Sequence, residues 1–372
     1  MPDLQPALVI ISPAFPRNEE ETQWLPLQQQ LAKTLQQQYP QIRIIVLSLY
    51  YPYETADYSW NGIAVSSFNG GNRGKIKHFL LWMNVWRKLT RIKKENRLIG
   101  IFSCWCGEAA LMGRHFSRWN HLPHFCWICG QDAGKTNKFV KWIRPGGNEL
   151  VAISHFIANE FYRNHGIKPK HIIPSAVDPK LFGEDQPERD IDILSAGSLS
   201  TLKQYEILVM ILFNLKKTYP SIRAIHCGTG EERATIQQLI RNFGLEKNLS
   251  LLGEQPHSEV LKWMQRSRLF MHPSSYEGFG TVCLEALYAG AQVISFTKPI
   301  NHEIKNWSIV RTPEEMQQKA LELLDRKFTP EKVLVYSIEE IAGKVMGLYL
   351  QQQSLPAGPA GFPSHVFHNP LH

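Results

Sequence analysis

The chain has 372 residues, of which 41 are basic and 33 acidic, giving a formal net charge of +8. Hydrophobic residues make up 43% and charged residues 20%, a globular composition that excludes a disordered or fibrous chain. At ~150 residues per domain, the length predicts about two domains, each large enough to form its own core.

The sequence has no pattern typical of a secreted or membrane-spanning protein. Met1-Pro2-Asp3 lacks the basic start of a signal peptide, and the first apolar run, Ala7–Ile11, is too short for one. The densest apolar stretch, Phe79–Val85, falls well short of the ~20 residues that cross a bilayer. Six cysteines in a chain of this length do not make a disulfide framework. We therefore expect a soluble, cytoplasmic protein.

Short apolar runs alternate with longer segments of helical period in the N-terminal half. The predicted strands are Ala7–Ile11, Ile42–Leu49, Leu98–Phe102, His124–Ile128 and Leu150–Ile153. The predicted helices are Trp24–Gln38, Lys75–Lys94, Glu108–Phe116 and one that starts at Ser154, a good N-cap residue. Such alternation is typical of βαβ units with a parallel sheet.

The alternation breaks at residues 174–190 and then restarts. The second set of predicted strands is Ile191–Leu194, Ile222–Cys227, Leu249–Leu252, Arg268–Met271 and Gln292–Ser295. The helices between and after them are Gln204–Lys217, Glu231–Phe243, Ser258–Met264 and Thr281–Ala289. The pattern predicts an α/β fold of two Rossmann-like domains that face each other across a cleft, with ligands at the carboxyl ends of the strands.

These boundaries divide the chain into four parts. The N-terminal domain is placed at residues 1–182 and the C-terminal domain at 183–335. A C-terminal helix at 336–353 is expected to pack back toward the N-terminal domain. The segment 354–372, rich in Pro, Gly and His, is predicted to be a disordered tail.

The stretch 275–290, SYEGFGTVCLEALYAG, contains the strongest chemical pattern in the chain. It follows an apolar strand and opens a helix through a glycine-bearing turn, where free backbone N–H groups favour an anion. Thr281 and Glu285 share one face of that helix, and Glu277 lies in the loop just ahead. Carboxylates accept hydrogen bonds from sugar and ribose hydroxyls. Either acid alone would be read as solvated, but the combination favours a binding site.

The spacing Glu277-x7-Glu285 resembles the E-x7-E motif of the retaining GT-B glycosyltransferases of the large family 4. Further stretches resemble the glycine-to-lysine segment of that family, its next strand–turn and its interdomain linker. In the N-terminal half, two stretches resemble a bacterial subgroup of the same family. These stretches are Ser195–Lys203, Cys227–Glu231, Ile173–Asp178 with Phe182, Gly130–Ala133 with Asn137, and Ala152–Phe156.

The resemblance implies a GT-B architecture with acceptor binding in the N-terminal domain and nucleotide-sugar binding in the C-terminal domain. The implied activity is metal-independent transfer of a hexose-type sugar, with retention, from a nucleotide-diphosphate sugar to a glycan or lipid-linked acceptor. The catalytic residues would be Lys203, Glu277 and Asp132. The donor-binding residues would be Gly197, Ser198, Lys203, Gly228, Glu277, Gly278, Phe279, Gly280, Thr281 and Glu285.

Three of these residues have separate expected roles. Glu285 is expected to hold the ribose and Glu277 the transferred sugar. Asp132 follows a predicted strand at its carboxyl end, where it could orient the acceptor hydroxyl or take its proton. The alternative for Asp132 is a simple turn residue.

The chain departs from the family pattern at several positions. Ser198 stands where the family usually has an arginine that helps to neutralise the donor diphosphate, so Lys203 remains as one of two cations. Cys129 stands where a histidine is common, and residues 17–22 replace the glycine pair of the first loop. The linker Asn-Gly is Ser175-Ala176.

No cofactor is expected, because the nucleotide-sugar is the substrate, and no metal is expected, because no D-x-D pair suggests one. Asp190-Ile191-Asp192 leads into a strand and is read as a solvated strand start. Gly228-x-Gly230 lacks the third glycine of a dinucleotide fingerprint. The cysteines 104, 106, 126 and 129 could form a four-thiolate zinc site, but buried free cysteines are the favoured interpretation.

The predicted helix 75–94 combines an apolar stripe with many lysines and arginines. Its stripe contains Phe79, Trp82, Met83, Trp86 and Leu89. Packing on the N-terminal sheet is the simpler interpretation, and contact with an anionic membrane is the functional one, which would place the protein at the inner face of the cytoplasmic membrane. We expect no nucleic-acid partner, because no aromatic stacking platform accompanies the basic residues.

Two other functions share this architecture. A degenerate glycosyltransferase would hold a nucleotide-sugar or lipid without turnover, and Ser198 and Cys129 favour that alternative. A nucleotide-sugar epimerase or a phosphorylase would need an acid/base set or a cofactor lysine, and no residue stands out for either.

Overall fold

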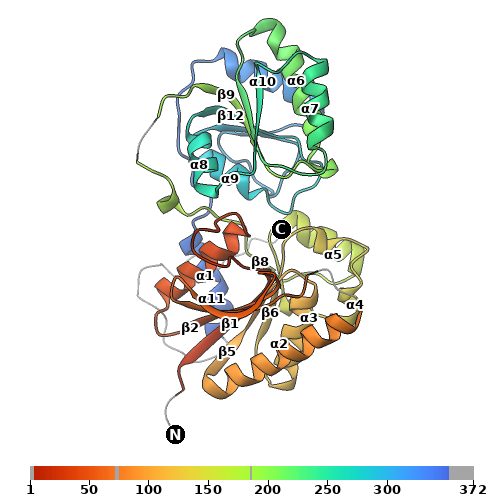
Figure 1. Cartoon of the computed structure of the whole chain (residues 1–372), viewed down its shortest axis with the longest axis vertical. Coiled ribbons are helices and arrows are strands. Elements are labelled where there is room, and N and C mark those ends of the chain that lie inside the picture. Colours follow the sequence, from red (N-terminus) through yellow and green to blue (C-terminus); the bar gives the residue numbers. More distant parts are fainter. Residues whose placement is uncertain (1–3, 72–74, 185–186, 352–372) are drawn as a thin grey trace.

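The computed structural model describes residues 4–71, 75–184 and 187–351, and the side chains of residues 75–77 are not described. The predicted tail at 354–372 therefore lies outside the described residues. Figure 1 shows two lobes, one above the other, with the chain passing between them twice. The lower lobe holds the N-terminal domain and also the last helix of the described chain.

The N-terminal domain is built on one sheet with the strand order β3-β4-β2-β1-β5-β6-β7-β8 in the described residues. All neighbouring pairs are parallel except the antiparallel β3–β4 hairpin. The strands are β1 (Pro6–Ala14), β2 (Arg43–Tyr51), β3 (Thr55–Trp60), β4 (Ile63–Phe68), β5 (Arg97–Cys104), β6 (His124–Ile128), β7 (Leu150–Ala152) and β8 (His171–Ile172).

Helices cover both faces of this sheet, which explains why its central strands, such as β1 and β5, are buried along nearly their whole length. The side chains of Ala7 and Val9 in β1 pack with one cluster from α2 and α3, and those of Leu8 and Ile10 with another from α1, α5 and α11. The helices of this half are α1 (Pro26–Gln38), α2 (Lys75–Glu95), α3 (Glu108–Trp119), α4 (Phe139–Ile143) and α5 (His155–His165). Ser154 caps α5 by accepting a hydrogen bond from the Ile157 N–H, as the sequence predicts.

The C-terminal domain has a parallel sheet in the order β11-β10-β9-β12-β13-β14. Counted from β9, this is the 3-2-1-4-5-6 order of a Rossmann fold. The strands are β9 (Ile191–Ala196), β10 (Ala224–Cys227), β11 (Leu249–Gly253), β12 (Ser267–His272), β13 (Gln292–Ser295) and β14 (Trp307–Ile309). The helices are α6 (Tyr205–Thr218), α7 (Arg233–Asn242), α8 (His257–Gln265), α9 (Thr281–Tyr288) and α10 (Pro313–Asp325).

The final helix, α11 (Ile338–Leu350), belongs to the fold of the other domain. It packs against α1, and the Tyr349 hydroxyl donates a hydrogen bond of 2.8 Å to the Ile101 carbonyl in β5. Figure 1 shows it in blue beside the red α1 in the lower lobe. The chain thus returns to its first domain after building its second.

The structure also contains elements that sequence periodicity does not predict. The hairpin β3–β4 falls where no strand was expected, because β3 alternates between exposed and partly buried residues, and the more buried β4 contains serines that interrupt its apolar run. The short α4 and β14 and the amphipathic α10 were also not predicted. Most of the remaining boundaries differ by only a few residues.

Candidate functional site

The strand order of the C-terminal sheet indicates where a ligand would bind. After β9 the chain passes to β10 on one side, whereas β12 begins the other half of the sheet on the opposite side. The crevice beyond the carboxyl ends of β9 and β12 is therefore the topological switch point of a doubly wound sheet. Gly197 follows β9 there, and His272 ends β12.

A compact charged cluster lies at this point. The ammonium group of Lys203, which ends a 3-10 turn after β9, forms an ion pair with the Glu277 carboxylate. His272 Nε2 lies 2.8 Å from the same carboxylate oxygen, and the His272 side chain is fully buried. The side chains of Lys203 and Glu277 are 22% and 14% exposed, so this pair interacts with little screening by water.

The two neighbours determine the charge state of Glu277. Burial alone would raise the pKa of Glu277, but the hydrogen bond from His272 and the positive charge of Lys203 lower it to about 2. Burial lowers the pKa of His272, which favours a neutral imidazole that donates from Nε2. Glu277 is therefore a carboxylate at neutral pH, held in one orientation.

Glycine is required where two loops of this site meet. Gly228 follows β10 with a φ of 144°, and a Cβ there would lie 1.9 Å from the Gly197 carbonyl oxygen. No side chain fits in that space, so the backbones after β9 and β10 pack directly together. The backbone of Gly197 lies beside the Lys203 side chain, since a Cβ at Gly197 would be 3.9 Å from the Lys203 Cε.

Helix α9 starts on the other side of the Lys203–Glu277 pair. Gly280 precedes it in a left-handed conformation with φ 78°, and its first turn carries no acidic residue. Thr281 Oγ1 lies 2.6 Å from the Ser175 hydroxyl in the linker. The positive end of the helix is thus open to an anion at the same crevice.

The second carboxylate of the E-x7-E spacing is buried one turn along α9. Glu285 Oε1 lies 2.7 Å from His257 Nε2 at the start of α8, and the two side chains are only 10% and 13% exposed. Burial alone would lower the pKa of His257, but the charge of Glu285 and the hydrogen bond to it raise it overall.

Backbone contacts between the domains form the floor of the crevice. The Ser154 hydroxyl donates 2.7 Å to the Gly278 carbonyl, and the Tyr276 hydroxyl donates 3.0 Å to the Gly130 carbonyl. A Cβ on Gly278 would lie 1.8 Å from the Cys129 carbonyl oxygen. The glycine is required here because the loop after β12 touches the loop after β6 of the other domain.

Asp132 supports this floor from the N-terminal side. Its carboxylate accepts hydrogen bonds from three backbone N–H groups, those of Cys106 at 2.8 Å, Cys129 at 3.1 Å and Gly130 at 2.8 Å. Burial raises its pKa to about 6 in spite of these donors. Asn137 binds the same region by donating to the Cys106 and Asp132 carbonyls, each at 2.7 Å. The structure thus gives Asp132 an evident part in shaping the loop, while contact with an acceptor stays a prediction.

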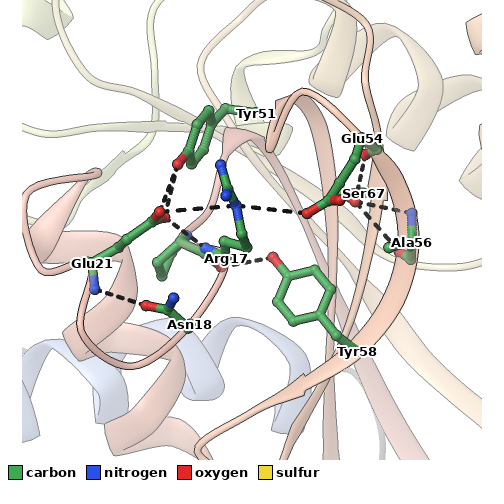
Figure 2. A network of polar contacts seen from close by, with 9 residues as sticks. Arg17, Asn18, Glu21, Tyr51, Glu54, Ala56, Tyr58 and Ser67 are labelled. Atoms are coloured by element: carbon green, nitrogen blue, oxygen red, sulfur yellow. Dashed lines mark hydrogen bonds and ion pairs between the residues drawn. The ribbon is translucent and has the colours of Figure 1, made fainter.

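The loop that replaces the glycine pair is held in a dense polar network, shown in Figure 2. The Tyr51 hydroxyl lies 2.9 Å from both carboxylate oxygens of Glu21, and the backbone N–H of Arg17 donates to Glu21 at 2.9 Å. Asn18 Oδ1 accepts from the backbone N–H of Glu21, and the Tyr58 hydroxyl donates to the Pro16 carbonyl. Thr22, at the end of this loop, reaches the C-terminal domain and accepts from the His257 N–H at 3.3 Å.

Not all predicted site residues converge in the same way. Around the crevice lie Gly197, Lys203, Gly228, Glu277, Gly278, Gly280, Thr281 and Glu285. Ser198 is exposed beside them. The side chain of Phe279 is 2% exposed and packs in the core against Tyr336, so the predicted donor contact of this residue would have to come from its backbone.

Sequence reasoning missed four contributors: His272, His257, Tyr276 and Ser154 as a bridge between the domains. A signal existed for His272, because a polar residue ends an otherwise apolar strand. Nothing in the sequence pairs His257 with Glu285, since they are brought together only by the packing of α8 on α9.

The cysteines do not form a recognisable metal site. Cys104, Cys106 and Cys126 are buried free thiols, and Cys129 is partly buried. Within residues 4–71, 75–184 and 187–351, no group of three or more His, Cys, Asp or Glu side chains is arranged to hold a metal ion. The favoured interpretation of free, buried cysteines agrees with this arrangement.

Helix α2 buries only part of its apolar stripe. Leu89 is fully buried, whereas Phe79 is 59% exposed. Between α2, α3 and α4 lies an almost entirely apolar groove of about 400 Å³, lined in part by Trp82, Trp86 and Trp142. In the described part of the chain, no helix is both long and apolar enough to span a membrane.

Comparison with known proteins relates this geometry to a family. Residues 178–327 match the family described as Glycosyl transferases group 1. This segment covers most of the C-terminal domain, so that domain is similar to the group 1 glycosyltransferases, in agreement with the coarser part of the resemblance noted from the sequence.

Two curated relatives are similar over about half of the chain. The phosphatidylinositol N-acetylglucosaminyltransferase gpi3 subunit of Schizosaccharomyces pombe is 29% identical over 53% of this chain and 44% of its own length. A Campylobacter jejuni N-acetylgalactosaminyltransferase, named for a diphospho-undecaprenol substrate, is 26% identical over 50% of this chain and 53% of its own length. The matches thus span only about half the length of these relatives.

Solved structures match nearly the whole fold. Sucrose-phosphate synthase from Thermosynechococcus elongatus superposes with a TM-score of 0.66 over 94% of this chain and 99% of its own, at 15% identity. Anabaena HepE in complex with UDP and glucose gives 0.63 over 94% and 95%, at 16% identity. These likenesses confirm the predicted α/β fold of GT-B type with two Rossmann-like sheets.

Proposed function

We propose that the protein is a glycosyltransferase that moves a sugar from a nucleotide-diphosphate sugar to an acceptor bound at the N-terminal domain. The observation that carries this proposal is the Lys203–Glu277–His272 cluster at the switch point of the C-terminal sheet. The match of residues 178–327 to the group 1 glycosyltransferases supports the same activity.

Departure of a nucleoside diphosphate builds negative charge on its leaving oxygen while the sugar becomes positively charged. Lys203 and the N-terminus of α9 are the groups in the crevice that would stabilise the diphosphate. In this role Lys203 exchanges its Glu277 partner for phosphate when the donor binds. Glu277 is then left to accept hydrogen bonds from the sugar hydroxyls, with His272 keeping it oriented.

The remaining donor contacts are proposed for the same loops. Glu285 holds the ribose, and the loops that carry Gly197, Gly228, Gly278 and Gly280 bind the diphosphate and the sugar. Ser198 lies exposed where a second cation would face the phosphates. Asp132 fixes the Cys129–Gly130 backbone beside the sugar and, in this proposal, contacts the acceptor hydroxyl.

We further propose that transfer is of a hexose-type sugar, retains anomeric configuration and needs neither a divalent metal nor a cofactor. Retention rests on the E-x7-E resemblance. Metal independence is supported by Lys203 and the end of α9, which offer the positive charge that a metal supplies in other transferases. An assay in excess EDTA, with the product linkage read by NMR, tests both statements.

The acceptor is proposed to be a glycan or a lipid-linked sugar, with the protein working in the cytoplasm at the inner face of the cytoplasmic membrane. The apolar groove beside α2, with exposed Phe79 and Trp142, supports contact of residues 75–94 with anionic lipid. The names of two relatives mention phosphatidylinositol and diphospho-undecaprenol. Flotation with vesicles containing phosphatidylglycerol should recover the protein, and Phe79→Ser with Trp142→Ser should abolish recovery.

The central experiment is a panel of UDP-, GDP- and ADP-sugars tested by thermal shift and then by hydrolysis or transfer. A true donor should raise the melting temperature, because ligand binding to the folded state stabilises it by mass action. Glu277→Ala should abolish sugar transfer while changing nucleoside diphosphate affinity less. Binding without turnover for every sugar would instead favour a degenerate binding protein, the alternative that the exposed Ser198 supports.

A further inference from the structure

His257 contacts both Glu285, in its own domain, and Thr22, in the N-terminal domain. Its imidazole Nε2 lies 2.7 Å from Glu285 Oε1, and its backbone N–H donates to the Thr22 hydroxyl of the other domain at 3.3 Å. We propose that His257 is a positioning residue that orients Glu285 for the nucleotide ribose and makes this orientation depend on the closed arrangement of the two domains. The inference rests on the proposed function, in which Glu285 binds the ribose.

The orientation of Glu285 depends on this one contact. A ribose presents two neighbouring hydroxyls, so the carboxylate must lie in a defined plane to accept from both. Among the described residues, His257 Nε2 is the side-chain group that hydrogen-bonds the Glu285 carboxylate. With side chains only 10% and 13% exposed, neither group can exchange its partner freely for water. The raised pKa of His257 agrees with a strong attraction between them.

The link to the other domain follows from how α8 begins. The first N–H groups of a helix have no intrahelical acceptor, and a side chain usually caps them. The residue before α8 is Pro256, which forms no side-chain cap hydrogen bond. Thr22 supplies an acceptor for the His257 N–H from the N-terminal domain.

Thr22 can act in this way because its loop is already fixed. Glu21 is held by the Tyr51 hydroxyl, and the Gln29 side chain donates to the Glu21 carbonyl at 3.1 Å. Figure 2 shows the contact between Tyr51 and Glu21. Separation of the domains would remove the cap from α8 and free the helix start that carries His257.

The test measures ribose recognition rather than affinity alone. Binding of UDP and of 2′,3′-dideoxy-UDP to the full chain is measured by calorimetry, and the ratio of the two dissociation constants reports the ribose contacts. We expect the wild type to prefer UDP by about tenfold or more, the scale for hydrogen bonds to a charged group. His257→Ala should reduce this preference at least about threefold, and His257→Gln, which keeps a donor near Nε2, should largely restore it.

Two further variants separate the parts of the inference. Thr22→Val, which removes the cap acceptor, should lower the preference less than His257→Ala does. Ser258→Ala, at the next and exposed position of α8, is the matched control and should keep the full preference. Equal preference in the wild type and Thr22→Val would overturn the dependence on domain closure.

The outcomes distinguish this inference from the function on which it rests. If Glu285→Ala keeps the preference for UDP, the proposed ribose role of Glu285 is wrong. If Glu285→Ala loses the preference but His257→Ala keeps it, Glu285 binds ribose without help and the positioning role is wrong. Loss in both, with rescue by His257→Gln, supports the inference, and loss in both without rescue overturns it.

Discussion

The carboxyl edges of the two sheets differ in what they present to the crevice. At the C-terminal edge, charged side chains meet: Lys203 with Glu277, and His257 with Glu285. At the N-terminal edge, the carboxylate of Asp132 is engaged by backbone N–H groups, and buried thiols surround it. The C-terminal edge thus presents paired charged side chains, whereas the N-terminal edge presents backbone that Asp132 holds in shape. Two sheets of similar architecture therefore contribute different groups to the crevice.

The largest effect should come from Lys203→Ala. The variant removes the cation placed to stabilise the leaving diphosphate, and loss of one preorganised charge-stabilising group costs about 3 kcal/mol, or roughly two orders of magnitude in kcat. Initial rates of sugar transfer at saturating donor measure it. Lys217→Ala, at an exposed position of α6 in the same domain, is the control. Unchanged turnover in Lys203→Ala would move the diphosphate site away from this edge.

The next prediction concerns Asp132 at the other edge. Its pKa is raised to about 6 by burial, so the folded state holds its proton more tightly than the unfolded state. The stability contributed by protonation is full below pH ~4 and is lost as the pH rises to about 6, an effect of up to about 3 kcal/mol. Urea unfolding of Asp132→Asn should lack this part of the pH dependence. Parallel profiles of the two proteins between pH 4 and 6 would contradict the prediction.

Gly278→Ala tests the contact between the edges. The added Cβ would lie 1.8 Å from the Cys129 carbonyl oxygen, so the two loops must separate, at a cost of about 1–3 kcal/mol. We expect a lower melting temperature and weaker donor binding. Gly107→Ala, where nothing lies within 4 Å of the added Cβ and φ is −132°, is the control. Equal losses in both variants would mean that the contact between the domains contributes nothing.

The smallest effect is expected for Ser198→Arg. It adds a cation at an exposed position beside Gly197, where the charge is partly screened by water, so nucleoside diphosphate should bind about two- to fivefold more tightly. Calorimetry at two salt concentrations measures it, because a real phosphate contact weakens at higher ionic strength. If the gain in affinity for nucleoside diphosphate did not depend on salt, the effect would not come from the added charge.

The sequence by itself determined the α/β alternation, the break between two similar halves and the E-x7-E spacing. Apolar runs such as Ala7–Ile11 identify strands because a parallel sheet covered on both faces has no polar side. The site residues from 197 to 285 could be predicted because local motifs carry them: glycines for close approach, a lysine after the first strand and two acids around a helix start. The hairpin β3–β4 was missed because β3 is polar and half-exposed and serines interrupt the apolar run of β4.

Only the tertiary structure decided how those residues are paired. His272 reaches Glu277, and His257 reaches Glu285, through the packing of separate elements, and no local spacing encodes either contact. The tertiary structure also places the Phe279 side chain in the core and engages Asp132 in hydrogen bonds with the backbone. The physical reason is that periodicity and propensity act over a few neighbouring residues. Partners such as Thr22 and His257 are brought together only when two domains, each with its own core, close on one another.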